Sequence, residues 1–326
     1  MTRSKLSRLL FSLVACALLA LGIAACGDDD DDSADSGDTS AETIQSNPDN
    51  EGIELTVGSK NFTEQFVLGE IYAQAFEAAG YDVKTDLNLG SEQIALKALE
   101  DGEISGYPEY TSTALTSFFD VPAEEVPNDA QQAVDDTQAQ FEEQGLVAFD
   151  PTPLNSANAV GLLTETAEEL DVSTISDLEG VSEDLTLYGS PECRQRVDCL
   201  VGLEENYGLT FKEFVPIDIA LRYEVLDKGD ADLSILFTTD AQLSESDEYT
   251  TLDDDQEVFP AGNVTFVASQ EAVDEAGPDM EDTAELVQGN LTNEVMQELN
   301  ARVDLDKEDP ADVAHDYLTE SGYVGG

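Results

Sequence analysis

The sequence has no tryptophan, a single histidine and only 13 basic residues beside 72 acidic ones. A formal net charge of -59 repels phosphate backbones and anionic headgroups, so it argues against nucleic-acid binding and against polybasic docking on a membrane. With His315 as its one histidine, the chain lacks the parts for Ser-His or Cys-His catalysis and for multi-histidine zinc sites. Hydrophobic residues still make up 41% of the 326 residues, which indicates a folded chain of about two domains.

The surplus of acidic residues does not by itself predict a site. No twelve-residue calcium loop with its central glycine and terminal glutamate is found in the sequence, so we expect no bound metal or cofactor. The acidity is interpreted as a solvated surface suited to a saline exterior. Carboxylates are too frequent for any pair of them to indicate a secreted hydrolase, which stays open as an alternative to a non-enzymatic protein. The lack of repeats argues against an adhesion or scaffolding protein.

Residues 1–25 have the pattern of a secretory signal peptide. Three basic residues precede an apolar stretch over residues 9–23, which is short for a membrane span. The stretch runs through Ile-Ala-Ala into Cys26 and resembles a bacterial lipobox, in which the cysteine carries the lipid; the alternative is an ordinary signal peptide followed by a chance cysteine. We therefore expect an extracytoplasmic protein anchored to the outer face of the cell membrane through Cys26, with residues 26–52 as an acidic tether.

Two cysteines remain for the folded part of the chain. Cys16 would leave with the signal peptide and Cys26 would carry the lipid, so Cys193 and Cys199 are left, six positions apart. In an oxidising compartment this pair predicts a disulfide. Closing so short a loop stabilises a protein by roughly 2 kcal/mol. A redox or metal site is less favoured, because no further ligands lie nearby in the sequence.

Apolar residues alternate between strand-like and helix-like periods from residue 53 onward, which predicts an α/β fold with mostly parallel sheets flanked by helices. Gly80 is predicted to end the first helix. Ligands of such sheets bind at the carboxyl ends of the strands. Strands are expected over 53–57, 81–87, 104–107, 159–163, 185–188, 214–217, 233–237 and 263–268. Helices are expected over 68–79, 92–100, just beyond Pro108, and over 167–170, 221–227, 280–288, 293–301 and 310–319.

Several segments resemble the substrate-binding proteins of osmoprotectant ABC importers, the group that binds glycine betaine, choline and carnitine. The most specific are residues 58–65, which read Gly-Ser-Lys-Asn-Phe-Thr-Glu-Gln, and residues 107–115, which read Tyr-Pro-Glu-Tyr-Thr-Ser-Thr-Ala-Leu. Further matching segments are 88–91, 102–104, 189–193, 207–209, 238–240 and 291–296. The resemblance covers nearly everything from residue 55 to the end of the chain.

This resemblance implies a two-lobed periplasmic-binding-protein fold, a type II-like clamshell that closes on its ligand. Lobe I is expected to comprise residues 53–157 plus 260–326, and lobe II residues 158–259. The implied function is that of an extracytoplasmic receptor. It would capture a quaternary-ammonium osmoprotectant, such as glycine betaine or choline, between the lobes and deliver it to the permease subunit of an ABC importer.

The resemblance also implies how the two ends of the ligand are held. Lys60 and Arg196 are expected to grip its carboxylate, with Thr113 as a hydrogen-bond donor and Glu192 supporting the site near Arg196. Taken alone, Lys60 would be a surface lysine; the motif around it is what favours a role in the site. Arg222 is expected only to pair with one of the many carboxylates.

Tyr110 is expected to form a wall of an aromatic cage around the quaternary ammonium. Such a group cannot donate hydrogen bonds, so proteins hold it against the faces of aromatic rings, and here the rings must be tyrosine or phenylalanine. Gln65, Tyr223 and Phe237 are further candidates for the ligand site, from segments that match less tightly.

The sequence departs from the pattern of the resemblance at two places. Asn158 and Ala261 stand where many members of the group carry an aromatic residue. An incomplete cage would bind betaine more weakly or accept another ligand. A receptor for a different amino-acid-like or zwitterionic solute therefore stays open as the alternative function.

Overall fold

The computed structural model describes residues 43–325, except for the side chain of Glu245. The signal peptide, Cys26 and most of the expected tether lie outside the described residues. Over the part that is described, none of the helices combines the length and the apolar character that crossing a membrane requires.

One sheet has six strands in the order β2-β1-β3-β11-β4, with β5 paired to the first residues of β11. β1 runs parallel to β2 and β3, whereas β11 runs antiparallel to β3, β4 and β5. A strand from late in the chain thus lies inside a sheet built from early ones. The strands are β1 (Glu54–Gly58), β2 (Asp82–Asp86), β3 (Gly106–Tyr110), β4 (Leu146–Ala148), β5 (Asn155–Ser156) and β11 (Gly262–Ser269).

The other sheet has five strands in the order β10-β6-β9-β7-β8. β7 runs parallel to β8 and β9, whereas β6 runs antiparallel to β9 and β10. The chain passes from the first sheet to the second between Ser156 and Asn158, and it returns before Gly262. The strands are β6 (Asn158–Leu163), β7 (Thr186–Gly189), β8 (Glu213–Pro216), β9 (Leu233–Phe237) and β10 (Tyr249–Thr251).

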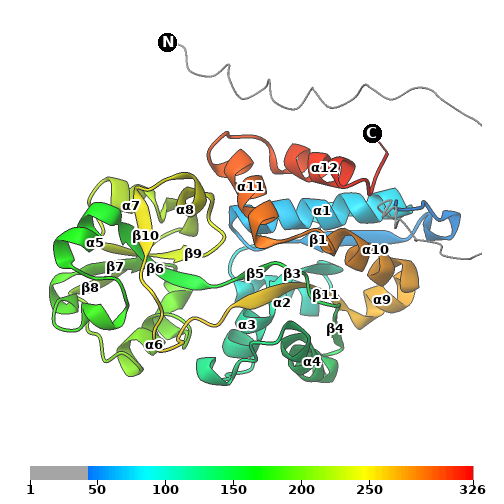
Figure 1. The fold of residues 1–326 in the computed structure, drawn as a ribbon. Helices are drawn as coiled ribbons and strands as arrows, with labels where there is room; N and C mark the ends of the chain where they lie inside the picture. Colours follow the sequence, from blue (N-terminus) through cyan, green and yellow to red (C-terminus); the bar gives the residue numbers. More distant parts are fainter. Residues whose placement is uncertain (1–42, 326) are drawn as a thin grey trace, which may run out of the picture. The chain divides into compact units, whose positions relative to one another are not determined.

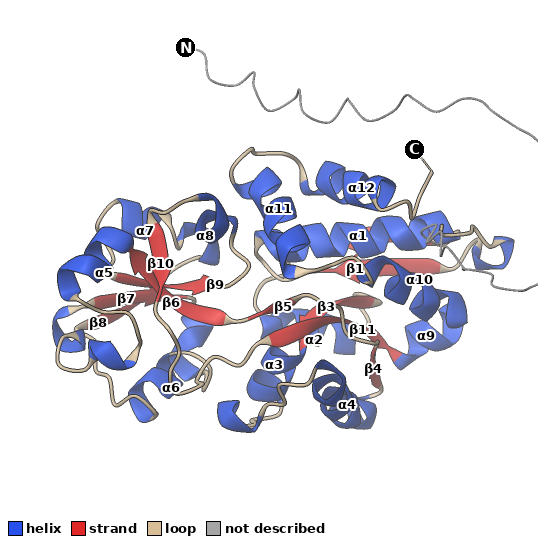
Figure 2. Cartoon of the chain, in the orientation of Figure 1, coloured by secondary structure: helices blue, strands red, loops and turns tan. Residues whose placement is uncertain are grey.

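Helices flank both sheets (Figure 1, Figure 2). At the first sheet, α1 packs against α10, α11 and α12 on one side, and the apolar residues of α2 and α4 form a separate cluster on the other. The helices of the first sheet are α1 (Thr63–Ala79), α2 (Glu92–Glu100), α3 (Thr111–Thr113), α4 (Ala130–Phe141), α9 (Gln270–Ala276), α10 (Pro278–Gln288), α11 (Asn293–Asp304) and α12 (Pro310–Glu320). Those of the second are α5 (Thr164–Leu170), α6 (Leu200–Glu205), α7 (Glu224–Asp227) and α8 (Ala241–Glu245).

The main core lies between the first sheet and α1. Tyr72 and Phe76 on α1 meet Phe266 on β11, with ring centroids 4.7 and 5.4 Å from that of Phe266. Gly80 ends the helix as predicted, because its φ of 105° is a left-handed conformation that a glycine adopts without strain. Packing in this core therefore fixes β1 and α1, which carry the two ends of the segment 58–65.

The predicted α/β organisation is present, but both sheets are mixed rather than mostly parallel. The difference arises at the strands nearest the two crossings: β6 and β11 run antiparallel to their neighbours. The helix expected just beyond Pro108 also begins later, at Thr111, because β3 extends through Pro108 to Tyr110. Proline is tolerated there because β1 pairs with β3 only at Gly106, so no neighbour on that side needs the missing N–H.

Residues 43–52 pack onto the first sheet's helices instead of extending a free tether. The backbone N–H of Ile44 donates to the carbonyl of Tyr323 at 2.8 Å, and that of Asn47 to the carbonyl of Ala79 at 2.9 Å. Asn50 is buried, and its amide also donates to Ala79. The prediction of a tether over residues 26–52 is therefore wrong for residues 43–52, whose polar side chains donate hydrogen bonds to backbone carbonyls of the folded unit.

Candidate functional site

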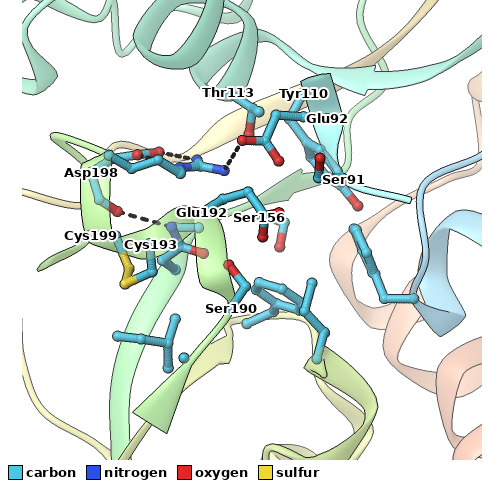
Figure 3. Close-up of a pocket in the computed structure, with 18 of the residues that line it drawn as sticks. Ser91, Glu92, Tyr110, Thr113, Ser156, Ser190, Glu192, Cys193, Asp198 and Cys199 are labelled. Atoms are coloured by element: carbon cyan, nitrogen blue, oxygen red, sulfur yellow. Dashed lines mark hydrogen bonds and ion pairs between the residues drawn. A yellow bond between two sulfur atoms is a disulfide. The ribbon is translucent and has the colours of Figure 1, made fainter. Parts of the chain in front are cut away.

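A cavity lies between elements of the two sheets (Figure 3). The empty space within it measures about 950 Å³, a volume that includes the part open to solvent. Its lining residues lie at or beyond the carboxyl ends of β1, β2, β3, β7, β8 and β9, or belong to the two segments in which the chain crosses between the sheets. This is the edge at which sheets of this kind offer a ligand both side chains and free backbone groups.

Most of the predicted ligand-binding residues line this cavity. The other two, Gln65 and Tyr223, do not line it but help to hold lining residues in place. Gln65 accepts a hydrogen bond of 3.2 Å from the backbone N–H of Lys60. Tyr223 donates its hydroxyl to Asp240 at 2.9 Å, and Asp240 in turn pairs with Arg222. Gln65 and Tyr223 are therefore supporting residues and not lining ones. The lining residues among the predicted set are Lys60, Tyr110, Thr113, Glu192, Arg196 and Phe237.

Lys60 follows β1 and is almost wholly buried, at 4% exposure. Its ammonium pairs with Glu109, which is fully buried, and lies 4.5 Å from the ring centroid of Tyr110 and 6.0 Å from that of Phe62. Burial lowers the pKa of Lys60, and the carboxylate of Glu109 opposes that effect. The ammonium expected to grip a ligand carboxylate therefore already has a carboxylate of the chain as its partner.

Tyr110 is the last residue of β3, and its hydroxyl begins a chain of hydrogen bonds that reaches a residue of the second sheet's side. Its hydroxyl donates to Glu64 on α1 at 2.6 Å, and the other oxygen of Glu64 accepts from the amide of Asn300 at 3.0 Å. The same amide donates to the backbone carbonyl of Thr239, which follows β9 of the second sheet, at 3.1 Å. Burial raises the pKa of Glu64 despite these hydrogen bonds. A buried carboxyl group thus lies where elements of the two sheets meet.

Arg196 is held mainly by Asp198, two residues further along the chain. Its Nε donates to Asp198 at 2.7 Å, and its Nη2 pairs with the other oxygen of the same carboxylate. Its Nη1 lies 3.6 Å from Glu92, the first residue of α2. Burial opposes the charge, but Asp198 and Glu92 raise the pKa of Arg196, so the guanidinium stays positive. This ion pair joins the loop after β7 to a helix of the first sheet.

The loop that carries Arg196 is closed by a disulfide. Cys193 lies in a 3-10 helix at Pro191–Gln195 and is bonded to Cys199, as the sequence predicted. Both cysteines are buried and line the cavity together with Glu192 (Figure 3). The disulfide therefore closes a short loop from which Arg196 and Asp198 line the cavity.

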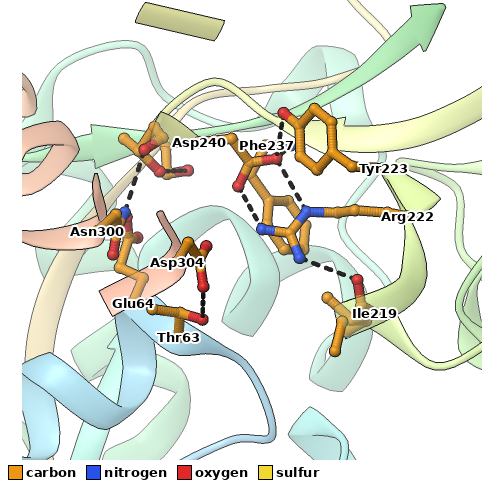
Figure 4. A network of polar contacts seen from close by, with 12 residues as sticks. Thr63, Glu64, Ile219, Arg222, Tyr223, Phe237, Asp240, Asn300 and Asp304 are labelled. Carbon is orange, nitrogen blue, oxygen red and sulfur yellow. Dashed lines mark hydrogen bonds and ion pairs between the residues drawn. The ribbon is translucent and has the colours of Figure 1, made fainter. Parts of the chain in front are cut away.

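Arg222 forms a third buried ion pair at the cavity (Figure 4). Its Nε and Nη2 donate to the two oxygens of Asp240 at 2.9 and 2.6 Å, and its Nη1 donates to the carbonyl of Ile219 at 2.9 Å. The guanidinium also lies 5.1 Å from the ring centroid of Phe237. The expectation that Arg222 pairs with a carboxylate is confirmed, but the pair lies at the cavity and not at a remote surface.

Four aromatic rings line the cavity, those of Phe62, Tyr110, Phe237 and Phe259. Phe62, just before α1, meets Phe237, at the end of β9, with ring centroids 5.1 Å apart. Phe62 also lies nearly parallel to Tyr110, at 6.3 Å. Rings from elements of both sheets are therefore in direct contact at the site.

Among the charged and aromatic residues that line the cavity, five were not predicted as ligand-binding: Phe62, Glu92, Asp198, Arg222 and Phe259. Phe62 lies inside the segment 58–65, so its position beside Lys60 was a usable signal. Glu92 and Asp198 had no such signal, because nothing distinguishes them among 72 acidic residues.

The two departures from the expected pattern have structural counterparts. Asn158 lines the cavity and donates its amide to the backbone carbonyl of Asp198 at 3.0 Å. Ala261 is not a lining residue, but Phe259 and Pro260 just before it are. A ring is thus present near the return crossing, two residues earlier than expected, whereas Asn158 supports the loop of Arg196.

Comparisons with known proteins agree with this geometry. A family model described as the substrate binding domain of ABC-type glycine betaine transport systems matches residues 53–320. A glycine-betaine-binding protein of Pseudomonas aeruginosa is 32% identical over 277 residues, which cover 82% of this chain and 87% of that protein.

Two further matches extend the comparison. An ergothioneine transport permease and ergothioneine binding protein of Helicobacter pylori is 28% identical over 277 residues, covering 82% of this chain and 48% of that protein. A solved structure described as a glycine betaine/carnitine/choline ABC transporter is 26% identical, with a TM-score of 0.64, over 82% of this chain and 99% of that one.

Proposed function

The chain belongs to the family of substrate-binding domains of ABC-type glycine betaine transport systems, and from this membership we propose that its cavity captures a small quaternary-ammonium osmoprotectant. Members of this family are extracytoplasmic solute receptors that deliver small ligands to ABC permeases; they are not enzymes. The similarity also confirms the predicted two-lobed periplasmic-binding-protein fold.

The ring-lined cavity is the observation that carries the proposal. A quaternary ammonium group has no hydrogen-bond donor, and it binds aromatic faces with up to about 2 kcal/mol per desolvated face. Phe62, Tyr110 and Phe237 supply rings from both sheets at one cavity. Lys60, Arg196 and Thr113 are the candidates for polar contacts to the rest of the ligand, and Glu192 also lines the cavity.

The lobes would then be residues 53–157 plus 260–326, and residues 158–259. This division is supported by the strands, because each sheet draws all its strands from one of the two sets. Phe62 with Phe237, and Glu92 with Arg196, are contacts between the two proposed lobes.

We further propose that the protein is a lipoprotein held at the outer face of the membrane by Cys26. The support is the sequence alone: a basic start, a short apolar stretch, and Ile-Ala-Ala before the cysteine. Metabolic labelling with a palmitate analogue should mark the wild type and leave Cys26→Ser unmarked. Label on the Cys26→Ser variant would contradict the anchor.

The alternative ligand is another solute with the same headgroup or an amino-acid-like zwitterion. The similarity to an ergothioneine binding protein favours including that compound, because ergothioneine is also a trimethylammonium zwitterion. A panel of choline, glycine betaine, carnitine, ergothioneine and proline, titrated into the purified protein by calorimetry, tests the class directly. Binding of proline alone would contradict the quaternary-ammonium proposal.

A ring variant tests the site within the same titrations. Phe62→Leu should weaken the best quaternary-ammonium ligand tenfold or more, which is about 1.4 kcal/mol, because it removes a ring that contacts two others. Phe118→Leu, a matched change at a ring outside the cavity, should leave the affinity unchanged. Equal affinities of the two variants would contradict the ring site.

A further inference from the structure

The cations at the cavity are already matched one to one by carboxylates of the chain. These pairs are Lys60 with Glu109, Arg196 with Asp198 and Arg222 with Asp240. Two more carboxylates, those of Glu92 and Glu192, also line the cavity. Once the pairs are counted as neutral, the cavity carries a surplus of negative charge.

Of these two carboxylates, Glu92 is the one that lies within ion-pair range of Arg196. It begins α2, is largely buried, and its Oε1 lies 3.6 Å from Nη1 of Arg196, within ion-pair range but beyond a hydrogen bond. Glu92 and Asp198, both labelled in Figure 3, contact different nitrogens of the Arg196 guanidinium. Glu192 has no ion pair within residues 43–325.

The guanidinium of Arg196 is consequently poorly available to a ligand carboxylate. Nε and Nη2, the fork that would grip a carboxylate with two hydrogen bonds, both serve Asp198. The remaining Nη1 faces Glu92. A ligand carboxylate approaching Nη1 would meet the like charge of Glu92 in a partly desolvated cavity, where such repulsion is strong.

A ligand that has a positive headgroup but no carboxylate is attracted by Glu92 and not repelled by it. Its positive headgroup offsets the surplus negative charge of Glu92 and Glu192, and its binding leaves the three ion pairs intact. From this charge arrangement we infer that Glu92 is a specificity-determining residue, which makes the cavity select a net cation, such as choline, over a zwitterion, such as glycine betaine. This inference rests on the proposed function and defines its ligand class further.

Three probes with the same headgroup isolate the effect of charge. Tetramethylammonium carries the headgroup alone, choline adds a hydroxyl and glycine betaine adds a carboxylate. Calorimetric titrations of the full-length protein at neutral pH should give at least tenfold tighter binding of choline than of glycine betaine. In Glu92→Gln this ratio should fall at least fivefold, through weaker choline binding, tighter betaine binding or both.

A control variant and the headgroup probe separate charge selection from general damage. Glu100→Gln removes the same charge from the exposed end of the same helix and should leave the ratio unchanged. Tetramethylammonium should still bind to Glu92→Gln, which shows that the cavity is intact.

Three results would overturn the inference. Glycine betaine binding as tightly as choline to the wild type would refute charge selection while leaving the proposed function in place. An unchanged ratio in Glu92→Gln would refute the role of this residue. Failure of all three probes to bind the wild type would refute the proposed function and this inference with it.

Discussion

The two sides of the cavity hold their charges in different ways. On the first sheet, Lys60 pairs with Glu109, which lies 49 positions away and is fully buried. On the second, Arg196 pairs with Asp198, only two residues away, within a loop closed by the disulfide. The first pair depends on the assembly of β1 and β3, whereas the second is organised by its own short segment.

The difference shows where a substitution should disturb the fold and where it should disturb mainly the site. Removing one partner of a fully buried ion pair leaves an uncompensated charge in the core, which is strongly destabilising. The Arg196 loop is closed by a covalent bond, so its charges can be changed with less effect on the rest of the sheet.

The largest expected effect is that of Lys60→Ala, because it leaves the carboxylate of Glu109 buried without its cation. We expect the free energy of unfolding to fall by about 3–5 kcal/mol, measured by urea denaturation. Lys84→Ala is the matched control, since Lys84 pairs with Glu54 on the same sheet but both side chains are mostly exposed. It should change stability little, and equal losses in the two variants would contradict the contrast.

A smaller loss is expected on the second side when the disulfide is removed. The double variant Cys193→Ala, Cys199→Ala should lose roughly 2 kcal/mol of unfolding free energy, the value for closing a loop of this length. Reductant should lower the stability of the wild type by a similar amount and leave the double variant unchanged. A loss as large as that of Lys60→Ala would show that the whole lobe, and not one loop, depends on the bond.

The smallest effect concerns Glu64, at the junction of the two sides, and it depends on pH. Burial raises the pKa of Glu64, so the folded chain binds this proton more tightly than the unfolded chain does. The stability of the wild type relative to Glu64→Gln should therefore be lowest above the raised pKa, rise as the pH falls through it, and level off below the ordinary value of 4.5. The slope cannot exceed about 1.4 kcal/mol per pH unit for one proton.

Urea denaturation at a series of pH values between 4 and 8 measures this profile. Glu77→Gln is the control, because Glu77 lies on the exposed face of the same helix. Its stability difference from the wild type should not follow the profile of Glu64→Gln. A Glu64→Gln difference that is flat across this range would contradict the buried, proton-binding role of Glu64.

Much of the first side of the cavity could be predicted from the sequence. The segments 58–65 and 107–115 are contiguous, so Lys60 and Tyr110 could be recognised without knowing the fold, and Gly80 marked the end of α1. The exact start of the helix after Tyr110 could not be predicted, because Pro108 normally interrupts a strand and is accepted here only where β1 no longer pairs. Strands of two or three residues, such as β4 and β5, carry no readable period.

The charge partners could not be predicted, because pairing is a property of the folded chain. Nothing in the sequence distinguishes Asp198 and Glu92 from the other acidic residues. Glu109 lies in the segment 107–115, but only the folded sheet shows that it is the partner of Lys60. The family resemblance therefore implied that Lys60 and Arg196 form a carboxylate clamp, without indicating which carboxylates of the chain they pair with. The structure shows that those cations already have partners, which changes the expected charge of the ligand.

A crystal structure of the protein with choline at saturating concentration tests the central claim most directly. We expect the trimethylammonium group inside the cavity, within about 6 Å of the ring centroids of at least two of Phe62, Tyr110, Phe237 and Phe259. The three ion pairs of Lys60, Arg196 and Arg222 should persist in that complex. Choline bound away from these rings, or a cavity that stays empty at saturation, would contradict the account.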